Sequence, residues 1–401
     1  MNTLKKAYCR IFQAGFRLAM PFMPYREPEI LNSVSEVEPL LKSLGIKSVL
    51  LVTDKQLRQF GATSNLEKSL KEGGIQCHVY DDTCPNPTVI NVEAARELYV
   101  KENCEALIAF GGGSSMDCAK AVGARIAYPN KTVNQMKGLL KVLKKIPVLI
   151  AVPTTAGTGS EVTITSVITN SEIKHKYTMN SFPLIPSHAV LDPAVTLTLP
   201  PSLTATTGMD ALTHAVEAYI GGSTTKETRA YALEAVKLIF ENLETAYADG
   251  KNEDARRNML RAAYIAGIAF SKSYVGYVHA VAHTLGGQYN VPHGLANAVL
   301  MPIVLDEYGE SAHQKLHELA TVAGISTECD IVSDSAKKFI QAIRDMNARM
   351  NIPIGFTNIV EADIPMMAEH ADAEANPLYP VPLLMDAKEL EKIYYKAMLS
   401  N

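Results

Sequence analysis

The chain has 401 residues, of which 47% are hydrophobic and 20% are charged, the balance of an ordinary globular protein long enough for two or three domains. Its 42 acidic residues against 38 Lys and Arg give a formal net charge of −4, which argues against nucleic acid as the main partner because no basic excess is present to neutralise phosphates. No apolar run reaches the about 20 residues that a membrane span needs, and the six scattered cysteines favour a cytoplasmic protein over a disulfide-linked secreted one.

Residues 1–28 form a basic, amphipathic N-terminal extension. Between residues 4 and 23 there are four basic residues and no acidic one, set among aromatic and aliphatic side chains. This composition is also that of a targeting peptide, but the serine enrichment and the small-residue cleavage site of such a peptide are missing. We expect instead an additional amphipathic helix that lies on the protein itself or on a partner subunit.

Residues 29–198 alternate short β-branched runs with helical stretches. Four runs have the pattern of buried strands, at residues 48–53, 77–80, 106–110 and 147–152. Because single helical stretches separate them, we expect parallel βαβ units around a buried sheet, which is an α/β domain. Residues 161–180 have the alternation of a β-hairpin with a polar tip.

From residue 199 to 401 the pattern is helical almost throughout. Alanine-rich stretches at 230–240 and 259–270 are typical of packed helices, and no convincing strand follows them. The sequence therefore predicts an all-α domain over residues 199–401, with the boundary near residue 198.

A glycine-rich turn connects the third expected strand to a helix. Gly111-Gly112-Gly113-Ser114-Ser115 lets the backbone approach a ligand closely, and the helix that starts here presents unpaired N–H groups. These two properties favour binding of a phosphate or pyrophosphate. The GxGxxG fingerprint is absent, so a tight turn without a ligand stays open as an alternative.

Two further features lie at the ends of expected strands. Asp54 follows the first strand, where a carboxylate can accept hydrogen bonds from an adenosine ribose and would repel a 2′-phosphate. Its alternative role is that of a helix cap. Residues 153–160 follow the fourth strand and are rich in threonine and glycine, so that they either line the same crevice or form a plain loop.

Five polar residues lie in apolar helical surroundings in the second half of the chain. Asp210 and His214 are four residues apart, as are His279 and His283, so each pair shares one helix face, and His293 follows. A single buried histidine is more often a hydrogen-bonded core residue, but five such groups are best satisfied by coordinating a divalent metal. Without a thiolate among them, these ligands suit Fe²⁺, Zn²⁺ or Mn²⁺. The HExxH motif of zinc peptidases is absent.

Four motifs in this order, Gly111–Asp117, Pro153–Glu161, Gly208–His214 and His279–Gly294, resemble those of the iron-containing (group III) alcohol dehydrogenases. The resemblance extends from about residue 30 to the C-terminus. It implies a Rossmann-like dinucleotide-binding domain followed by a helical metal domain, together a dehydroquinate synthase-like fold. It also implies NAD(H)-linked, metal-dependent interconversion of a primary or secondary alcohol or diol and its aldehyde or ketone.

The resemblance assigns roles by position. Asp210, His214, His279 and His293 resemble the metal ligands, and His283 resembles a histidine beside the metal that is thought to relay a proton. The positions that resemble cofactor-binding residues are Asp54, Asn86, Gly112, Gly113, Ser114, Asp117, Thr154, Thr155, Thr158, Thr163 and Lys176. The implied cofactors are NAD rather than NADP, and Fe²⁺ with Zn²⁺ as the alternative. The implied partners are a small alcohol or aldehyde and further copies of the chain in a homodimer or larger homo-oligomer.

The chain departs from the family pattern in two places. The first 25 or so residues extend beyond the family core, so no role transfers to them, and Leu378 stands where the family has an arginine near the substrate entrance. The identity of the substrate therefore stays open.

Three other functions fit the sequence less well than the dehydrogenase. A dehydroquinate synthase-like lyase also uses NAD and a metal but needs several basic residues at its site, and here only Lys272 lies close to the ligand segment. A metal-dependent hydrolase without a nucleotide would leave the glycine turn and Asp54 unexplained. A scaffold protein would have no reason to bury five polar groups.

Overall fold

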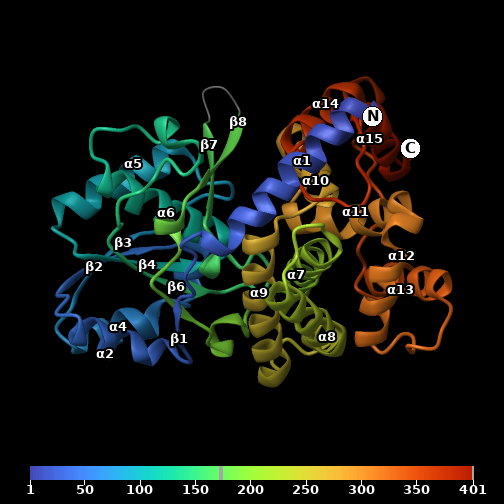
Figure 1. The fold of residues 1–401 in the computed structure, drawn as a ribbon. Helices are drawn as coiled ribbons and strands as arrows, with labels where there is room; N and C mark the ends of the chain where they lie inside the picture. Colours follow the sequence, from blue (N-terminus) through green and yellow to red (C-terminus); the bar gives the residue numbers. More distant parts are fainter. Residues whose placement is uncertain (171–174, 400–401) are drawn as a thin grey trace. The chain divides into compact units, whose positions relative to one another are not determined.

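The computed structural model describes residues 1–170 and 175–399, which form two compact units. One unit is the segment Pro24–Leu199, and the other combines Met1–Met23 with the chain from Pro200 onward. Figure 1 shows the first as a sheet with helices and the second as a set of helices. Among the described helices, none combines the length and apolar character that a membrane span requires.

The first unit is built on a six-stranded sheet in which every pair of neighbouring strands is parallel. The strand order is β1 (Glu29–Leu31), β9 (His188–Val190), β6 (Val148–Pro153), β4 (Ala106–Gly111), β2 (Ser48–Val52) and β3 (Gln76–Tyr80). Four of these strands match the four runs in the sequence. The strands β1 and β9 were not expected, because three residues are too few to show a periodic pattern.

Helices cover both faces of this sheet, as Figure 1 shows for α5 and α6 on one side and α2 and α4 on the other. Side chains of β2 alternate between the two faces of the sheet. Leu50 and Val52 lie in the core under α5 and α6, and Val49 and Leu51 lie in the core under α2 and α4. Burial on both faces explains why the strand reads as a continuous apolar run. The helices of this unit are α2 (Val37–Ser43), α3 (Lys55–Gln59), α4 (Ser64–Glu72), α5 (Val89–Lys101) and α6 (Gly113–Ala127).

A second, three-stranded sheet contains the expected hairpin. Its order is β5 (Gly138–Leu139), β8 (His175–Asn180) and β7 (Thr165–Asn170), and β7 pairs with β8 antiparallel. The expected polar tip of the hairpin, residues 171–174, lies outside the described residues.

The second unit is helical, as expected for the chain after residue 198. Its helices are α7 (Pro201–Ile220), α8 (Lys226–Ala248), α9 (Glu253–Ser273), α10 (Tyr277–Tyr289), α11 (His293–Tyr308), α12 (Glu310–Val322), α13 (Val332–Arg349), α14 (Ile364–Ala375) and α15 (Ala387–Ala397). The central helix α7 is buried along most of its length. It approaches α8 closely at Gly208, where a Cβ atom would lie 2.2 Å from Cδ1 of Leu243.

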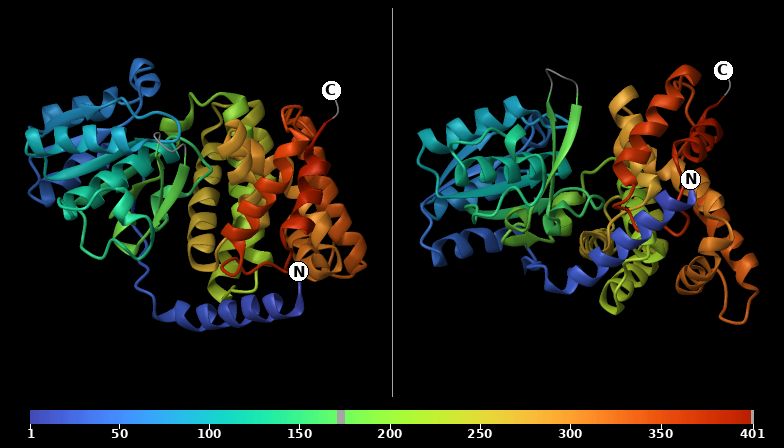
Figure 2. Two further views of the ribbon diagram at one scale, coloured as in Figure 1. Left: turned by 90° about the horizontal axis from the view of Figure 1, so that it is seen from above. Right: turned by 45° about the horizontal axis from the view of Figure 1, so that its top comes forward.

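The N-terminal extension forms the helix α1 (Thr3–Ala19), which belongs to the helical unit. It begins at Asn2, whose side chain accepts a hydrogen bond from the backbone N–H of Lys5 at 2.8 Å. Figure 2 shows α1 lying alongside the other helices of that unit. The expected amphipathic helix thus packs on the chain's own helical unit.

Short 3-10 helices lie between these elements, at η1 (Met20–Phe22), η2 (Val34–Glu36), η3 (Asn134–Met136), η4 (Ser160–Val162), η5 (Phe182–Leu184), η6 (Pro193–Thr196) and η7 (Glu361–Asp363).

Candidate active site

Four side chains of the helical unit converge on one point. The ligand-type atoms of Asp210, His214, His279 and His293 all lie within 4.8 Å of one another. Asp210 and His214 come from adjacent turns of α7, His279 comes from α10, and His293 is the first residue of α11. The first three side chains are buried, whereas His293 is partly exposed.

A glycine brings His293 close to Asp210. A Cβ atom on Gly294 would lie 2.4 Å from the carbonyl oxygen of Thr206 in α7, so a larger residue would push the start of α11 away from α7. With glycine there, Nε2 of His293 lies 3.4 Å from Oδ1 of Asp210. The close approach of the backbones of α7 and α11 therefore brings together two of the four side chains of the cluster, Asp210 and His293.

The cluster has the electrostatics of a cation site. Burial, followed by the neighbouring histidines, holds the pKa of His279 well below its usual value, so its imidazole is neutral and carries a lone pair. The side-chain amide nitrogen of Asn297 lies 2.6 Å from Oδ1 of Asp210, 3.1 Å from Nε2 of His293 and 3.2 Å from Nε2 of His279. The single amide group of Asn297 thus faces three acceptor atoms. A positive charge is favourable at the point where these acceptors meet. One carboxylate oxygen and three imidazole nitrogens fit a divalent iron or zinc ion.

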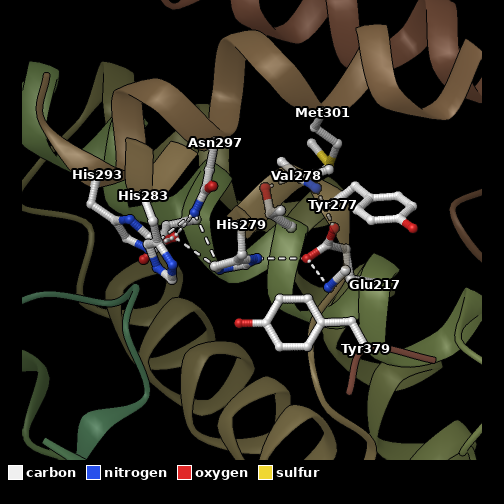
Figure 3. Close-up of polar contacts among 12 residues, drawn as sticks. Glu217, Tyr277, Val278, His279, His283, His293, Asn297, Met301 and Tyr379 are labelled. Carbon is white, nitrogen blue, oxygen red and sulfur yellow. Dashed lines mark hydrogen bonds and ion pairs between the residues drawn. The ribbon is translucent and has the colours of Figure 1, made fainter. Parts of the chain in front are cut away.

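Glu217 holds His279 from the side opposite to the cluster. In Figure 3 the ring of His279 lies between Glu217 on one side and Asn297 and His293 on the other. Nδ1 of His279 lies 2.6 Å from Oε2 of Glu217, and the backbone N–H groups of Gly276 and Val278 donate to the same carboxylate at 2.8 Å. Burial raises the pKa of Glu217 to about 8, and hydrogen bonds from the backbone N–H groups of Gly276, Val278 and His279 oppose that rise. A carboxylate in this place fixes which nitrogen of His279 faces the cluster.

Glu217 and Asn297 were not predicted from the sequence. Both have a signal in the sequence, because Glu217 lies one turn beyond His214 on α7 and Asn297 lies one turn beyond His293 on α11. Their spacing places them near the ligand face, but only the folded structure brings them to their partners.

His283 lies one turn beyond His279 on α10 and next to the cluster. Its ring is stacked on that of His293, with centroids 5.3 Å apart, and 37% of its side chain is exposed. Its Nδ1 lies 2.6 Å from Oε1 of Glu374. The ring of Phe270 stacks on that of His214, with centroids 4.2 Å apart.

The glycine turn lies in the α/β unit, at the junction of β4 and α6. Gly111 has a φ of +151°, and a Cβ atom there would lie 2.4 Å from Oγ of Ser115. Gly112 precedes the first residue of α6, Gly113, and no side chain caps this helix start. The backbone N–H groups of the first turn, which includes the partly exposed Ser114, are therefore not used by a capping side chain.

The threonines expected near the cofactor lie beside this turn. The backbone N–H of Thr154 donates to the carbonyl of Gly111 at 3.0 Å, which joins the ends of β6 and β4. A Cβ atom on Gly112 would lie 3.4 Å from Oγ1 of Thr155, and one on Gly113 would lie 2.9 Å from Cγ2 of Thr158. The loop 153–160 and the glycine turn are thus packed together.

Asp117 and Thr163 contact a buried network rather than standing free at the turn. Lys120 is fully buried, and its Nζ donates to Oγ1 of Thr163 at 3.0 Å and to two backbone carbonyls. Oγ of Ser160 donates to Oδ1 of Asp117 at 3.2 Å. Burial raises the pKa of Asp117 to about 6 and lowers that of Lys120 to about 8. This network, which the sequence analysis did not find, ties α6 to the chain between β6 and β7.

The other expected cofactor residues have local roles in the structure. Oδ1 of Asp54 accepts a hydrogen bond from the backbone N–H of Leu57 at 2.9 Å, so Asp54 caps α3. This is the alternative role that the sequence left open. Nζ of Lys176 donates to Oδ1 of Asn86 at 2.8 Å, so the fold brings these two expected residues together.

Comparisons with known families identify the chain. The model of the iron-containing alcohol dehydrogenases matches residues 31–193, and that of the C-terminal part of the Fe-containing alcohol dehydrogenase family matches residues 204–398. The chain belongs to the iron-containing alcohol dehydrogenase family. It is 40% identical to the 1,3-propanediol dehydrogenase of Citrobacter freundii over 370 residues, which are 91% of this chain and 95% of that protein.

Two solved structures extend the comparison. A crystal structure of a 1,3-propanediol oxidoreductase has a TM-score of 0.90 and 38% identity, covering 93% of this chain and 99% of the other. The sulfoacetaldehyde reductase of Bifidobacterium kashiwanohense in complex with NAD⁺ has a TM-score of 0.83 and 29% identity, covering 94% of this chain and 99% of the other. This iron-containing alcohol dehydrogenase thus has the expected fold and reaction class, which is NAD-dependent oxidoreduction of alcohols. The comparisons do not support the lyase or the hydrolase, which were alternatives to this function.

Replacing His279 by alanine removes a buried nitrogen from the centre of the cluster. We expect the His279→Ala protein to bind iron or zinc at least about tenfold more weakly, since loss of even an outer partner of a metal ligand costs that much. The measurement is elemental analysis of the purified protein after dialysis against a metal buffer. His370→Ala, on the exposed surface of α14, is the control and should keep its metal. Full metal content in His279→Ala would contradict the assignment.

Proposed function

We propose that Asp210, His214, His279 and His293 bind Fe²⁺, with Zn²⁺ as the alternative, and that the enzyme uses NAD rather than NADP to interconvert a small alcohol or diol and its aldehyde or ketone. The single observation that supports the metal assignment is the convergence of one carboxylate and three imidazoles to within 4.8 Å. A divalent cation bound there supplies Lewis-acid polarisation of the substrate oxygen.

The residues around this cluster keep its geometry fixed. Two backbone N–H groups hold Glu217, Glu217 in turn contacts Nδ1 of His279, and the ring of Phe270 stacks on one face of His214. Pre-organised ligands of this kind need no rearrangement when the substrate arrives.

His283 is the proposed proton carrier. Oxidation of the alcohol transfers a hydride to NAD⁺ and releases the hydroxyl proton, which needs an acceptor. Because Nδ1 of His283 hydrogen bonds to Glu374, the proton is exchanged at Nε2. With 37% of the side chain exposed, the ring can pass that proton on to water.

The α/β unit carries the proposed cofactor site. The start of α6 at Gly112, Gly113 and Ser114 offers backbone N–H groups to the pyrophosphate, and the adjacent threonines contribute hydroxyl groups. Support comes from the relative with bound NAD⁺, which aligns over 94% of this chain. The carboxylate of Asp54 at the end of β2 disfavours the 2′-phosphate of NADP.

The substrate is proposed from the relatives. Their names include 1,3-propanediol dehydrogenase, NAD-dependent methanol dehydrogenase of Bacillus methanolicus and lactaldehyde reductase of Escherichia coli. All three act on short alcohols or aldehydes, so a short-chain alcohol or diol is the first class to test. The proposal also includes a homo-oligomer, which the family resemblance implies, and a cytoplasmic location, which the scattered cysteines favour.

The dehydrogenase proposal is tested by NADH oxidation. The protein is stripped with a chelator, reloaded with Fe²⁺ or Zn²⁺, and mixed with NADH and a panel of short aldehydes, while absorbance is followed at the NADH maximum. We expect loss of NADH only in the metal-loaded samples, and the rates with the two ions identify the better metal. Binding of NADH without oxidation by any aldehyde in either metal form would overturn the proposal.

His283→Ala should keep metal and NAD⁺ binding but lose turnover. We expect kcat to fall by about 10²- to 10⁴-fold, the usual contribution of a general acid–base group. Steady-state kinetics give kcat, and elemental analysis and NADH fluorescence check the two binding steps. Unchanged turnover would exclude His283 as the proton carrier.

Asp54→Asn tests the preference for NAD. Asparagine caps a helix about as well as aspartate, so α3 should stay intact while the charge that repels a 2′-phosphate is lost. We expect the ratio of kcat/KM for NADPH to that for NADH to rise by about tenfold or more, and the melting temperature to stay unchanged. An unchanged ratio would mean that Asp54 is only a helix cap.

A further inference from the structure

The N-terminal helix α1 packs against the end of α14 and the irregular chain that follows it. This C-terminal brace segment, residues 372–382, comprises the last turn of α14 and the irregular residues that lead toward α15. Nζ of Lys5 pairs with the carboxylate of Asp372 at 2.6 Å, and the guanidinium of Arg10 donates to the carbonyls of Val381 and Pro382 at 2.8 and 2.9 Å. Both family models match only after residue 30, so α1 lies outside the part of the chain that they match.

Gln13 makes the central contact between α1 and this segment. The side chain is buried, and its amide nitrogen donates to the carbonyls of Pro377 and Tyr379 at 3.1 and 2.8 Å. Nη1 of Arg10 donates to the amide oxygen of Gln13 at 3.0 Å, which fixes the amide with its nitrogen toward the brace segment. Buried carbonyls outside regular structure need such donors.

The brace segment also carries the carboxylate that contacts His283. The hydroxyl of Tyr379 donates to Oε1 of Glu374 at 2.8 Å, and the same oxygen lies 2.6 Å from Nδ1 of His283. Burial raises the pKa of Glu374, but the charge of His283 and the hydrogen bonds from His283 and Tyr379 outweigh it and leave the pKa below its usual value. The ionised carboxylate only accepts hydrogen bonds, so the proton of a neutral His283 lies on Nδ1 and the lone pair on Nε2.

We infer that Glu374 is a positioning residue for His283, and that α1, through Gln13, holds Glu374 in place for that role. The inference rests on the proposed function in one respect, which is that His283 carries the proton. Hydrogen bonds connect each step, from Gln13 to the backbone of Tyr379, from the Tyr379 hydroxyl to Glu374, and from Glu374 to Nδ1 of His283. The N-terminal extension thereby acts on the catalytic histidine without contacting it.

The first test compares kinetics in a double-mutant cycle of Glu374→Gln and His283→Ala. We expect Glu374→Gln to lower kcat by about tenfold to 100-fold, with the KM for NADH and the metal content unchanged, because a positioning partner of a site histidine is worth that much. In the His283→Ala background the same change should cost less than about twofold, since the partner is gone. Equal losses in the two backgrounds would overturn the inference.

The second test observes the tautomer of His283 directly. Imidazole ¹⁵N chemical shifts are recorded on the metal-free protein, and the His283 signals are assigned by their loss in His283→Ala. We expect the proton on Nδ1 in the wild type and a shift toward the Nε2–H tautomer in Glu374→Ala. A Glu374→Ala protein that fails to fold is replaced by Glu374→Gln, for which a mixture of tautomers is expected. Unchanged ¹⁵N shifts in the variants would overturn the inference.

The role of α1 is tested with Gln13→Leu, which keeps the volume but removes the donors. We expect the same change in tautomer and a fall in kcat of about three- to tenfold, smaller than for Glu374 because the brace segment keeps its other contacts. The control is Leu18→Ala, on the exposed side of α1, which should change neither. If Glu374→Gln lowers kcat and Gln13→Leu does not, α1 has no part in positioning.

Failure of this inference can be distinguished from failure of the proposed function. If His283→Ala is fully active, the proposed function fails. If His283→Ala is inactive but Glu374→Gln has the kcat of the wild type, only this inference is overturned.

Discussion

Four lone-pair donors placed within 4.8 Å of one another in an apolar helical core are the constraint on which the helical unit depends. Such a set is unfavourable unless a positive charge or hydrogen-bond donors compensate it. The fold meets this constraint by bringing three helices close together. Glycine at 294 allows α11 to touch α7, and glycine at 276 leaves room for Glu217, because a Cβ atom there would lie 2.7 Å from Oε1 of that residue. The glycines and the buried polar residues of this region are therefore explained together, because the glycines give the polar side chains the room to meet.

Two carboxylates of the helical unit have the same relation to a histidine. Glu217 contacts Nδ1 of His279 and Glu374 contacts Nδ1 of His283, each at 2.6 Å. Since each acid contacts Nδ1, both histidines direct Nε2 to the other side. Their surroundings differ, because His279 is 3% exposed and His283 is 37% exposed. Burial suits a fixed ligand, and exposure suits a group that exchanges protons with water.

The sequence predicted those features that have a local pattern. The runs of β2 and β4 are buried on both sides and were visible as apolar stretches, and the spacing of four between Asp210 and His214 placed both on one face of α7. The three-residue strands β1 and β9 have no such pattern. Glu217 and Glu374 were missed because the histidines that they contact, His279 and His283, are 62 and 91 residues away, so no short spacing links either acid to its partner. For Asp54 the sequence allowed two roles, and the cap of α3 is visible because it is a contact over three residues.

The contact between α1 and the brace segment joins residues that are far apart in the order of synthesis. Gln13 and its acceptor on Tyr379 are 366 residues apart. At about 5–20 residues per second, a ribosome needs on the order of 20 to 70 s to pass from one to the other. During that interval the α/β segment 24–199 can complete its sheet, while the brace segment that α1 contacts has not yet been made. Helix α1 therefore precedes every other helix described here in the order of synthesis, yet it gains its contacts with residues 372–382 only after nearly all of them have been made.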